Sequence, residues 1–409
     1  MLSSRSRATR WRARLALAGA AGLAVLAALP SGPARAASAD GIQDKQQWVL
    51  SMLDVNAAWT VTKGAGVTVA VIDSGVNPAV SDLSGSVVTG PDYTGVTTSP
   101  SSSDWGVHGT WMASLVAGHG HDGGFDGVTG IAPRARILSI RVIPDRGDPH
   151  YSKYEREQET VIQQSLANGI RYAVAHGAQV ISMSIGYSAP SSTVRAELQQ
   201  AYDHGVVVIA SAGNSGGPSG ANRAGDAPES FPADYPGVIS VGAVGPSGNV
   251  AGFSSDNLSV QVAAPGVNVP AQGRDGEYWL VSGTSPACAL VAGVAALIKS
   301  QYPHLAPDQV ASALTSTTTD RPAGGYNSQV GFGIVDAAAA LARAGKLAGV
   351  RPVEASVKNT AKYHGTLPPA PVGPRGSGQL VLFALLALAS LALAAAAVTQ
   401  LAILRRANR

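Results

Sequence analysis

The central part of the chain alternates short apolar runs with segments of helical periodicity. Five near-continuous apolar runs follow one another: Val67–Ile72, Ile137–Val142, Val180–Ser184, Val206–Ala210 and Val238–Val244. Runs of this length without polar alternation are typical of strands that are buried on both faces of a sheet. The pattern therefore predicts a largely parallel sheet inside the molecule.

Two helices are predicted between these strands. Apolar residues recur every four positions from Ile162 to Val174, and this pattern stops before Gly177. A second helical segment around residues 196–202 stops before Gly205. Glycine just past the last periodic residue is a common helix stop. Strands and helices in this order predict an α/β fold with helices on both faces of the sheet and its chemistry at the carboxyl ends of the strands.

The N-terminal segment has the layout of a secretory signal peptide. Five arginines precede an apolar run from Leu15 to Leu29, and small residues follow around Ala36 and Ala39. The run is shorter than the roughly 20 residues that span a bilayer, which disfavours a first membrane helix. We expect a signal peptide over residues 1–36, cut after Ala36 or Ala39.

The C-terminal segment is expected to anchor the protein in a membrane. Leu380–Val398 is uncharged, and the apolar stretch continues to Leu404 before two arginines. This length can span a bilayer, and the stretch lacks the polar face that a buried core helix of a soluble protein would show. The predicted organisation is an N-terminal extension (37–63), a folded central domain (64–346), a Pro- and Gly-rich linker (347–378), a transmembrane helix (379–404) and a basic cytoplasmic tail (405–409). The basic tail predicts that the central domain lies outside the cytoplasm.

Composition and charge narrow the class of protein. The 409 residues are 45% hydrophobic with 48 glycines and 25 prolines, which is typical of a globular enzyme with many turns. Nine of the 29 basic residues are arginines that lie before Asp40 or in the last five residues of the chain, and without them 20 basic residues stand against 26 acidic ones. This balance argues against nucleic acid as a partner. The single cysteine, Cys288, allows no internal disulfide.

The polar tract from Asp145 to Glu159 interrupts the connection from a strand to a helix. We interpret this tract as an exposed loop, with a flap that contacts substrate as the alternative. No internal repeat is present.

Three short segments carry candidate chemistry. The first strand ends in Asp73-Ser-Gly, a helical segment begins at His108-Gly-Thr, and Gly-Thr-Ser285-Pro286 opens a long apolar helix. Taken singly, these residues could be a turn aspartate, a structural histidine and an N-cap serine. Proline fits the first helical position, which would place Ser285 at the helix start. The order Asp, His, Ser is far more specific than any one segment.

Together these segments resemble the subtilase (subtilisin-like) serine peptidases, a resemblance that extends from about Gly64 to Leu341. It rests on the three segments above and on further motifs, namely Gly130-Ile-Ala-Pro, Val180-Ile-Ser-Met-Ser-Ile-Gly186, Ala210-Ser-Ala-Gly-Asn214-Ser-Gly, Phe231-Pro-Ala, Ala264-Pro-Gly and Gly331-Phe-Gly-Ile-Val-Asp. The resemblance implies a subtilisin-like three-layer fold and hydrolysis of peptide bonds through an acyl-enzyme.

The resemblance also implies a role for each matching residue. Ser285 is the nucleophile, His108 the general base and Asp73 its orienting partner, with Asn214 in the oxyanion hole. The implied substrate-binding residues are Ser184, Ile185, Gly186, Ser211, Ala212 and Gly213. Two residues of the serine helix depart from the family pattern, because Pro286 replaces a bulky residue and Ala289 replaces a proline.

The whole layout looks like a mycosin, the membrane-anchored subtilase associated with type VII secretion. About 27 residues precede Gly64 after the signal peptide, too few for the usual inhibitory prodomain. We expect this extension to stay attached, with Trp48 and Trp59 as apolar anchors. A type VII membrane complex is therefore an expected partner, beside polypeptide substrates.

Two other functions are less consistent with the sequence. A catalytically silent subtilase scaffold would brace a secretion complex without cutting peptides, and the intact triad and Asn214 argue against it. An esterase of the α/β-hydrolase fold would need a G-x-S-x-G elbow that leads from a strand into a helix ahead of its acid and histidine, and the sequence predicts no such strand-to-helix elbow. No cofactor and no metal are expected, because His119, His121 and Asp122 lie in a glycine-rich loop where such residues are usually solvated.

Overall fold

In the computed structural model, the described residues are 35–37, 41–121, 126–152, 158–216 and 227–349. The predicted signal peptide up to residue 34, most of the linker, the transmembrane helix and the basic tail lie outside these residues. None of the described helices combines the length and the apolar character needed to cross a bilayer.

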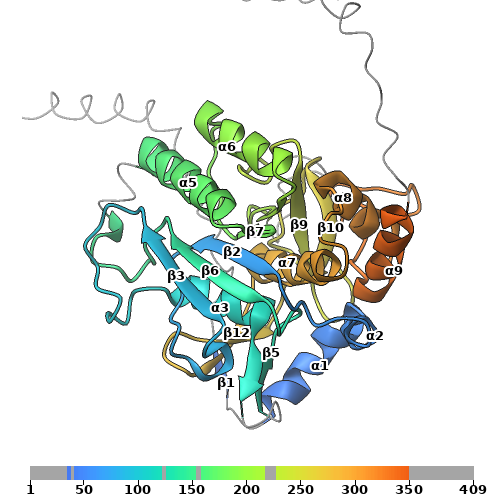
Figure 1. The fold of residues 1–409 in the computed structure, drawn as a ribbon, viewed down its shortest axis with the longest axis horizontal. Helices are drawn as coiled ribbons and strands as arrows, with labels where there is room; N and C mark the ends of the chain where they lie inside the picture. Colours follow the sequence, from blue (N-terminus) through green and yellow to red (C-terminus); the bar gives the residue numbers. More distant parts are fainter. Residues whose placement is uncertain (1–34, 38–40, 122–125, 153–157, 217–226, 350–409) are drawn as a thin grey trace, which may run out of the picture. The chain divides into compact units, whose positions relative to one another are not determined.

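A fully parallel seven-stranded sheet forms the centre of the fold (Figure 1). The spatial order is β10-β9-β8-β7-β2-β6-β3, and each neighbouring pair runs parallel. The strands are β2 (Thr68–Asp73), β3 (Val87–Asp92), β6 (Arg136–Arg141), β7 (Val180–Met183), β8 (Val207–Ser211), β9 (Val238–Val244) and β10 (Val260–Pro265). Five of these strands, β2, β6, β7, β8 and β9, coincide with the apolar runs and confirm that these runs are strands. The sequence missed β3 and β10, because β3 is a half-exposed edge strand and Gln261 interrupts the apolar run of β10.

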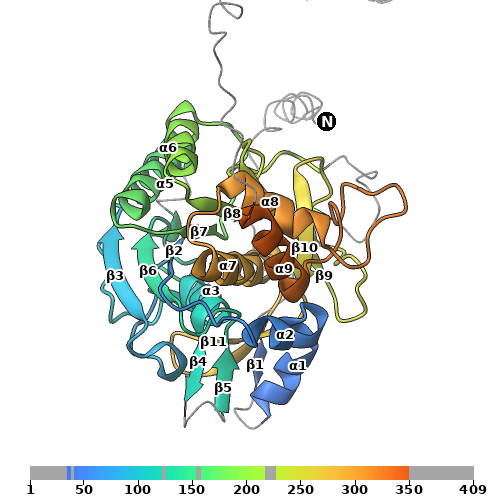
Figure 2. The same ribbon diagram turned by 45° about the vertical axis from the view of Figure 1, so that its right-hand side comes forward.

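Helices cover both faces of this sheet, which confirms the predicted three-layer α/β fold (Figures 1 and 2). Helices α5 (Gln158–Ala175) and α6 (Ser192–Asp203) cover one face and end before Gly177 and Gly205, as their sequences predict. Both glycines have positive φ angles of 72° and 75°, the conformation that favours glycine after a helix. The other face is covered by α3 (Val107–Ala117) and α7 (Thr284–Gln301), with α8 (Pro307–Ser316) and α9 (Ala337–Ala348) beyond them.

Helix α7 is the central helix of the second layer. Every residue from Thr284 to Lys299 is buried, which matches a segment that is apolar on all sides. Its small residues allow close packing, since a Cβ at Gly293 would press against the Ile131 side chain. Cys288 is free and buried in this helix, as expected for a chain with one cysteine.

The strand order reverses at β2. The chain places β6 on one side of β2 and then crosses over it to form β7 on the other side. Ligands and catalytic groups gather at such a reversal, outside the carboxyl ends of parallel strands. Asp73 is the last residue of β2 and therefore lies at this point.

Two small sheets and a helical pair complete the described chain. β1 (Arg35–Ala37), β12 (Tyr278–Val281) and β11 (Val269–Gln272) form one antiparallel sheet, and β4 (His119–His121) pairs with β5 (Asp126–Thr129) in a hairpin. A 3-10 turn, η1 (Ser81–Leu83), follows β2. The N-terminal extension forms α1 (Ile42–Met52) and α2 (Val55–Trp59).

The N-terminal extension packs against the central domain. Both polar ends of the buried Gln46 side chain bond the backbone of Thr129, and Trp59 Nε1 donates to the carbonyl of Ile131 at 2.8 Å. The predicted anchors were incomplete, however. Trp48 and Trp59 are only partly buried, and the fully buried apolar side chains are aliphatic: Ile42, Val49, Leu53 and Val55.

Candidate active site

Asp73 and His108 form a buried hydrogen-bonded pair. The Nδ1 atom of His108 lies 2.8 Å from Oδ1 and 3.0 Å from Oδ2 of Asp73, whose side chain is almost fully buried. The Ser74 backbone N–H also donates to Asp73 Oδ1 at 2.6 Å. These bonds stabilise a carboxylate that would otherwise be costly to bury. Because the carboxylate accepts from Nδ1, the imidazole leaves Nε2 for a third group.

His108 is the second residue of α3, as the sequence predicts. Gly109 brings this helix against the end of β2, where its N–H donates to Ser74 Oγ at 3.1 Å. A Cβ at Gly109 would overlap the carbonyl oxygen of Gly75 and come within 3.3 Å of Asp73 Cβ. The glycine thus allows the close approach that lets His108 reach Asp73.

Ser285 is the second residue of α7, and its helix begins earlier than expected. The N-cap is Gly283, so Ser285 is not an N-cap serine and Pro286 is the third helical residue rather than the first. Proline is tolerated there because the first four N–H groups of a helix have no partner within the helix. The serine side chain is only 4% exposed.

Ser285 and His108 line one small cleft. Trp111, Met112 and Pro286 also line it. The structure records no hydrogen bond between the Ser285 hydroxyl and the His108 ring, although both are described residues. Catalytic hydrogen bonds are often long in unliganded enzymes and tighten when substrate binds.

Asn214 follows β8 and reaches the start of α7. Its Oδ1 accepts the backbone N–H of Thr284 at 2.9 Å and the Thr284 hydroxyl, also at 2.9 Å. A backbone N–H can only donate, so the carbonyl end of the Asn214 amide faces Thr284 and the NH₂ end points away. Nearby, the Ser285 backbone N–H lies in the first turn of α7, where amide groups point out of the helix end.

The predicted substrate-binding segments follow two neighbouring strands. Ser184, Ile185 and Gly186 come after β7, and Ser184 Oγ donates to the carbonyl oxygen of Ser285 at 3.1 Å. Ser211 ends β8, and Ala212 and Gly213 follow it; the Gly213 N–H donates to Thr284 Oγ1 at 3.2 Å. Gly213 has a φ of 100° and approaches Ser255 closely, which explains a glycine there. Both segments therefore contact the first turn of α7.

The charges around His108 favour its protonated form. Burial alone lowers the pKa of His108, but the charge of Asp73, its hydrogen bond and the charge of Asp145 outweigh burial and raise the pKa above 6.5. Burial raises the pKa of the Cys288 thiol to about 11. Because the thiolate is the nucleophilic form, Cys288 is not a candidate nucleophile.

The interpretation of residues 145–159 as an exposed loop was wrong at its beginning. Asp145 and Asp148 are 8% and 3% exposed. Asp148 pairs with the buried guanidinium of Arg141 at 3.0 Å, and Asp145 binds the start of α3. Among the described residues, Arg141 has the largest fully buried side chain, and an arginine so buried requires partners. The position of Arg141 at the end of an apolar run was the sequence signal that could have indicated buried acidic partners nearby.

The histidines of the β4–β5 hairpin bind protein groups. His119 contacts the carbonyl oxygens of Gly120 and Ser84, and His121 Nδ1 lies 2.7 Å from the buried Asp82. Asp122 lies outside the described residues. Within the part of the chain that is described, no three His, Cys, Asp or Glu side chains gather to hold a metal.

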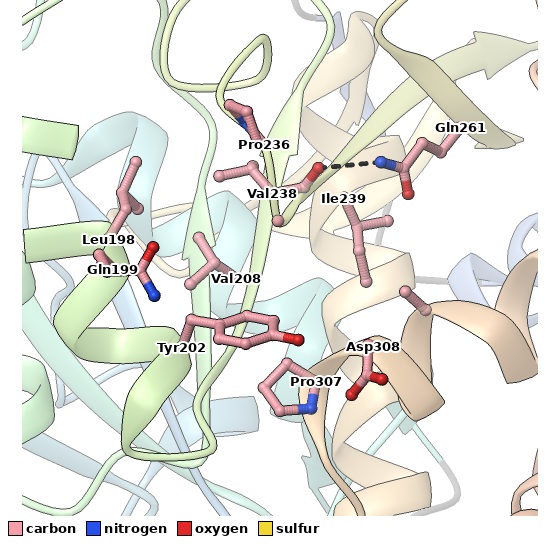
Figure 3. A pocket seen from close by; sticks show the side chains of 12 residues that line it. Leu198, Gln199, Tyr202, Val208, Pro236, Val238, Ile239, Gln261, Pro307 and Asp308 are labelled. Atoms are coloured by element: carbon pink, nitrogen blue, oxygen red, sulfur yellow. Dashed lines mark hydrogen bonds between the residues drawn. The ribbon is translucent and has the colours of Figure 1, made fainter. Parts of the chain in front are cut away.

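A larger cavity lies away from these residues. It has a volume of about 400 Å³ and opens between α6, β9 and α8. Figure 3 shows Tyr202 extending from α6 into it, toward Pro307. None of the candidate catalytic or substrate-binding residues lines it, so its size does not make it the active site.

Similarity to known proteins agrees with this geometry. Residues 64–333 match the subtilase family of peptidases. Subtilisin DY of Bacillus licheniformis is 36% identical over 282 residues, which cover 68% of this chain and 92% of that protein. Subtilisin E of Bacillus subtilis (strain 168) is 36% identical over 256 residues, covering 63% of this chain and 61% of subtilisin E.

Solved structures with the same fold include MycP1 and MycP3. MycP1 from Mycobacterium smegmatis has a TM-score of 0.62 and 30% identity, covering 77% of this chain and 88% of MycP1. The MycP3 protease of the type VII (ESX-3) secretion system has a TM-score of 0.60 and 31% identity, covering 78% of this chain and 91% of MycP3. The family match spans more than half of the chain, and the Asp, His and Ser segments lie within it. The chain belongs to the subtilase family and is a subtilisin-like serine endopeptidase.

Proposed function

We propose that Asp73, His108 and Ser285 are the catalytic triad of this endopeptidase. The observation that carries the proposal is the buried Asp73 carboxylate on His108 Nδ1, with Ser285 in the same cleft as the imidazole. His108 takes the Ser285 hydroxyl proton on Nε2 as the oxygen attacks the scissile carbonyl carbon. It then gives this proton to the leaving amine, and water hydrolyses the acyl-enzyme by the same steps in reverse order. Asp73 holds the tautomer and stabilises the imidazolium.

The oxyanion of the tetrahedral intermediate is held by two donors. These are the NH₂ end of the Asn214 side chain and the backbone N–H of Ser285. The contacts with Thr284 support this role, because they turn the carbonyl end of Asn214 away from the oxyanion. Donors that are fixed before the reaction stabilise developing charge without reorganising.

The substrate is an extended polypeptide that lies between two segments. Ser184, Ile185 and Gly186 bind its backbone as an added strand, and Ser211, Ala212 and Gly213 form the opposite wall. The support is their position, since both segments follow neighbouring strands and both bond the first turn of the serine helix.

A serine-directed fluorophosphonate probe and a peptide substrate test the triad. The Ser285→Ala variant is expected to lose both covalent labelling and peptide hydrolysis. Ser282→Ala is the matched control, because Ser282 lines the same cleft and should leave labelling intact. Undiminished hydrolysis by Ser285→Ala would refute the assignment.

We also propose that the protein is held on the outer face of the cell membrane and works with a type VII secretion complex. The terminal sequence patterns support the location, and similarity to the MycP1 and MycP3 proteases supports the partner. Truncation before Gly378 should release an active protein into the medium, and external protease should reach the catalytic domain in protoplasts. Protection of that domain would contradict the location.

The Ser285→Ala variant also decides between proteolysis and bracing. If the protein acts in secretion by cutting a substrate, this variant will not restore secretion to a strain that lacks the protein. Restored secretion by a stable, inactive variant would favour the scaffold role.

A further inference from the structure

The helix that carries His108 is capped by a side chain from another segment. The N-cap residue of α3, Gly106, has a φ of 72° and no side chain to accept the first N–H groups. Asp145, four residues after the end of β6, supplies the acceptors. Its Oδ2 accepts the Val107 N–H at 2.8 Å, and its Oδ1 accepts the His108 N–H at 3.0 Å.

This carboxylate binds the catalytic residue itself. The His108 N–H is one of the two groups that it accepts, so any movement of Asp145 moves the backbone from which the imidazole extends. A negative charge at a helix N-terminus is also favourable, because the helix dipole is positive there. Burial raises the pKa of the Asp145 carboxyl, which is 8% exposed, and the hydrogen bonds from His108 and Val107 offset part of this shift.

Asp145 is held in place by a buried ionic network. The Asp148 N–H closes a turn onto the Asp145 carbonyl at 3.0 Å. The Asp148 carboxylate accepts from Arg141 Nη2 at 3.0 Å and from Thr98 Oγ1 at 2.6 Å. The other guanidinium nitrogens bond Asp92, Thr94 and the Ser74 carbonyl.

The same network reaches the other partner of His108. Arg141 Nε donates to the carbonyl of Ser74 at 3.1 Å, and Ser74 directly follows Asp73. Arg141 and Asp73 also lie opposite each other in the register of the neighbouring strands β6 and β2. A single buried guanidinium therefore bonds the backbone next to Asp73 and the Asp148 side chain, whose backbone N–H bonds the Asp145 carbonyl.

We propose that Asp145 is a positioning residue for His108, a proposal that rests on the triad function proposed above. Its carboxylate fixes the backbone of His108, and its charge adds to that of Asp73 in stabilising the imidazolium. The charged groups that face this site are Asp73 from β2 and Asp145 from the β6 loop. Asp104 lies nearby, within reach of Gly147, and Arg141 lies behind Ser74.

Asp145→Asn is the main test variant, because it keeps the size of the side chain and removes its charge. One amide end then presents N–H groups to a backbone N–H, so one capping bond is lost. Asp104→Asn is the matched control, since it removes a nearby charge that makes no bond to the start of α3. Asp145→Glu keeps the charge but moves the carboxylate by one methylene group.

Two readouts separate positioning from simple stability. The first is kcat and KM over a range of pH. The second is the pKa of the His108 imidazole, measured by NMR in the Ser285→Ala background. The NMR measurement needs no activity, so it tests the role of Asp145 even if the proposed triad function is wrong. An error in the triad function would appear separately, as undiminished hydrolysis by the Ser285→Ala variant.

For Asp145→Asn we expect kcat to fall by about 10- to 100-fold, the usual scale for a displaced catalytic group, with KM little changed. Loss of the charge should lower the pKa of His108 and move the acid limb of kcat/KM to lower pH. Asp145→Glu should lower kcat and leave the acid limb near that of the wild type, and Asp104→Asn should leave kcat unchanged.

Wild-type kcat together with an unchanged His108 pKa in Asp145→Asn would overturn the proposal. If Asp145→Asn does not fold, Asp145→Glu decides, and wild-type kcat in that variant would overturn it as well.

Discussion

Both donors of Thr284, its backbone N–H and its hydroxyl, point at Oδ1 of Asn214, each at 2.9 Å. This relationship fixes the direction of the Asn214 amide without any contact to substrate. The hydroxyl of Thr284 also accepts the Gly213 N–H at 3.2 Å. One threonine at the start of α7 thus joins the loop after β8 to the helix of the nucleophile.

Replacement of Asn214 should slow catalysis without removing the nucleophile. In subtilisin, loss of one oxyanion-hole donor lowers kcat by about 10²- to 10³-fold, and we carry this figure over for Asn214→Ala. Asn214→Asp should be at least as slow, because it keeps an acceptor for Thr284 but presents negative charge to the oxyanion. Single-turnover rates and fluorophosphonate labelling provide the measurement. An Asn214→Ala variant with wild-type kcat would show that this amide is not a donor in the transition state.

The pH dependence of kcat/KM should report the raised pKa of His108. The general base must be neutral, so activity is lost as the pH falls through the pKa of His108 in the free enzyme. Because Asp73 and Asp145 raise that pKa despite burial, we expect the acid limb above the ordinary value of 6.5. Rates from about pH 5 to about pH 9 would locate it. An acid limb centred at or below 6.5 would contradict the expected balance of burial and charge.

Gly109→Ala should impair catalysis although it removes no functional group. The new methyl would overlap the carbonyl oxygen of Gly75, so α3 must move away from β2 and carry His108 with it. We expect kcat to fall by about 10- to 100-fold. Gly252→Ala is the control, because a Cβ there meets no atom within 4 Å. Comparable kcat values for the two variants would show that the contact at Gly109 does not set the position of His108.

The hydrogen bond from Trp59 to Ile131 should contribute to stability. Trp59→Phe keeps an aromatic ring under Lys63 and loses the indole N–H, so the free energy of unfolding should fall by about 1 kcal/mol. Trp48→Phe is the matched control, since Trp48 packs on the same core without such a bond. Urea unfolding of the ectodomain gives the difference between the two variants. Equal losses would mean that ring packing rather than the hydrogen bond ties the extension down.

The strands and helices around the site could be predicted from sequence because their signal is local. Continuous apolar runs mark strands buried between two helical layers, and β2, β6, β7, β8 and β9 all arise from such runs. Asp73 could be located because it ends the first apolar run, and His108 because it opens a helical segment. Asn214 followed from the resemblance to subtilases. Edge strand β3 lacks this signal, because a strand that is half exposed shows no uninterrupted apolar run.

The start of α7 and the anchors of the extension depended on tertiary packing. Pro286 suggested a helix beginning at that residue, but Gly283 caps the helix and places Ser285 inside its first turn. Trp48 and Trp59 suggested aromatic anchors, but Ile42, Val49 and Leu53 fill the interface more completely. In both cases the residue types suggested a plausible local structure. The contacts with neighbouring segments decided where the helix begins and which side chains of the extension are buried.

The sequence by itself predicted five strands of the parallel sheet and the three residues of the proposed triad, because apolar runs and short motifs are properties of neighbouring positions. Only the tertiary structure decided that Asp145 is buried at the N-terminus of the helix that carries His108. A run of polar residues looks the same in a solvated loop and in a buried network. The difference lies in the partners of these residues. The N–H groups of α3 are far from Asp145 in the sequence, and Arg141 becomes a buried partner of Asp148 only when the sheet forms.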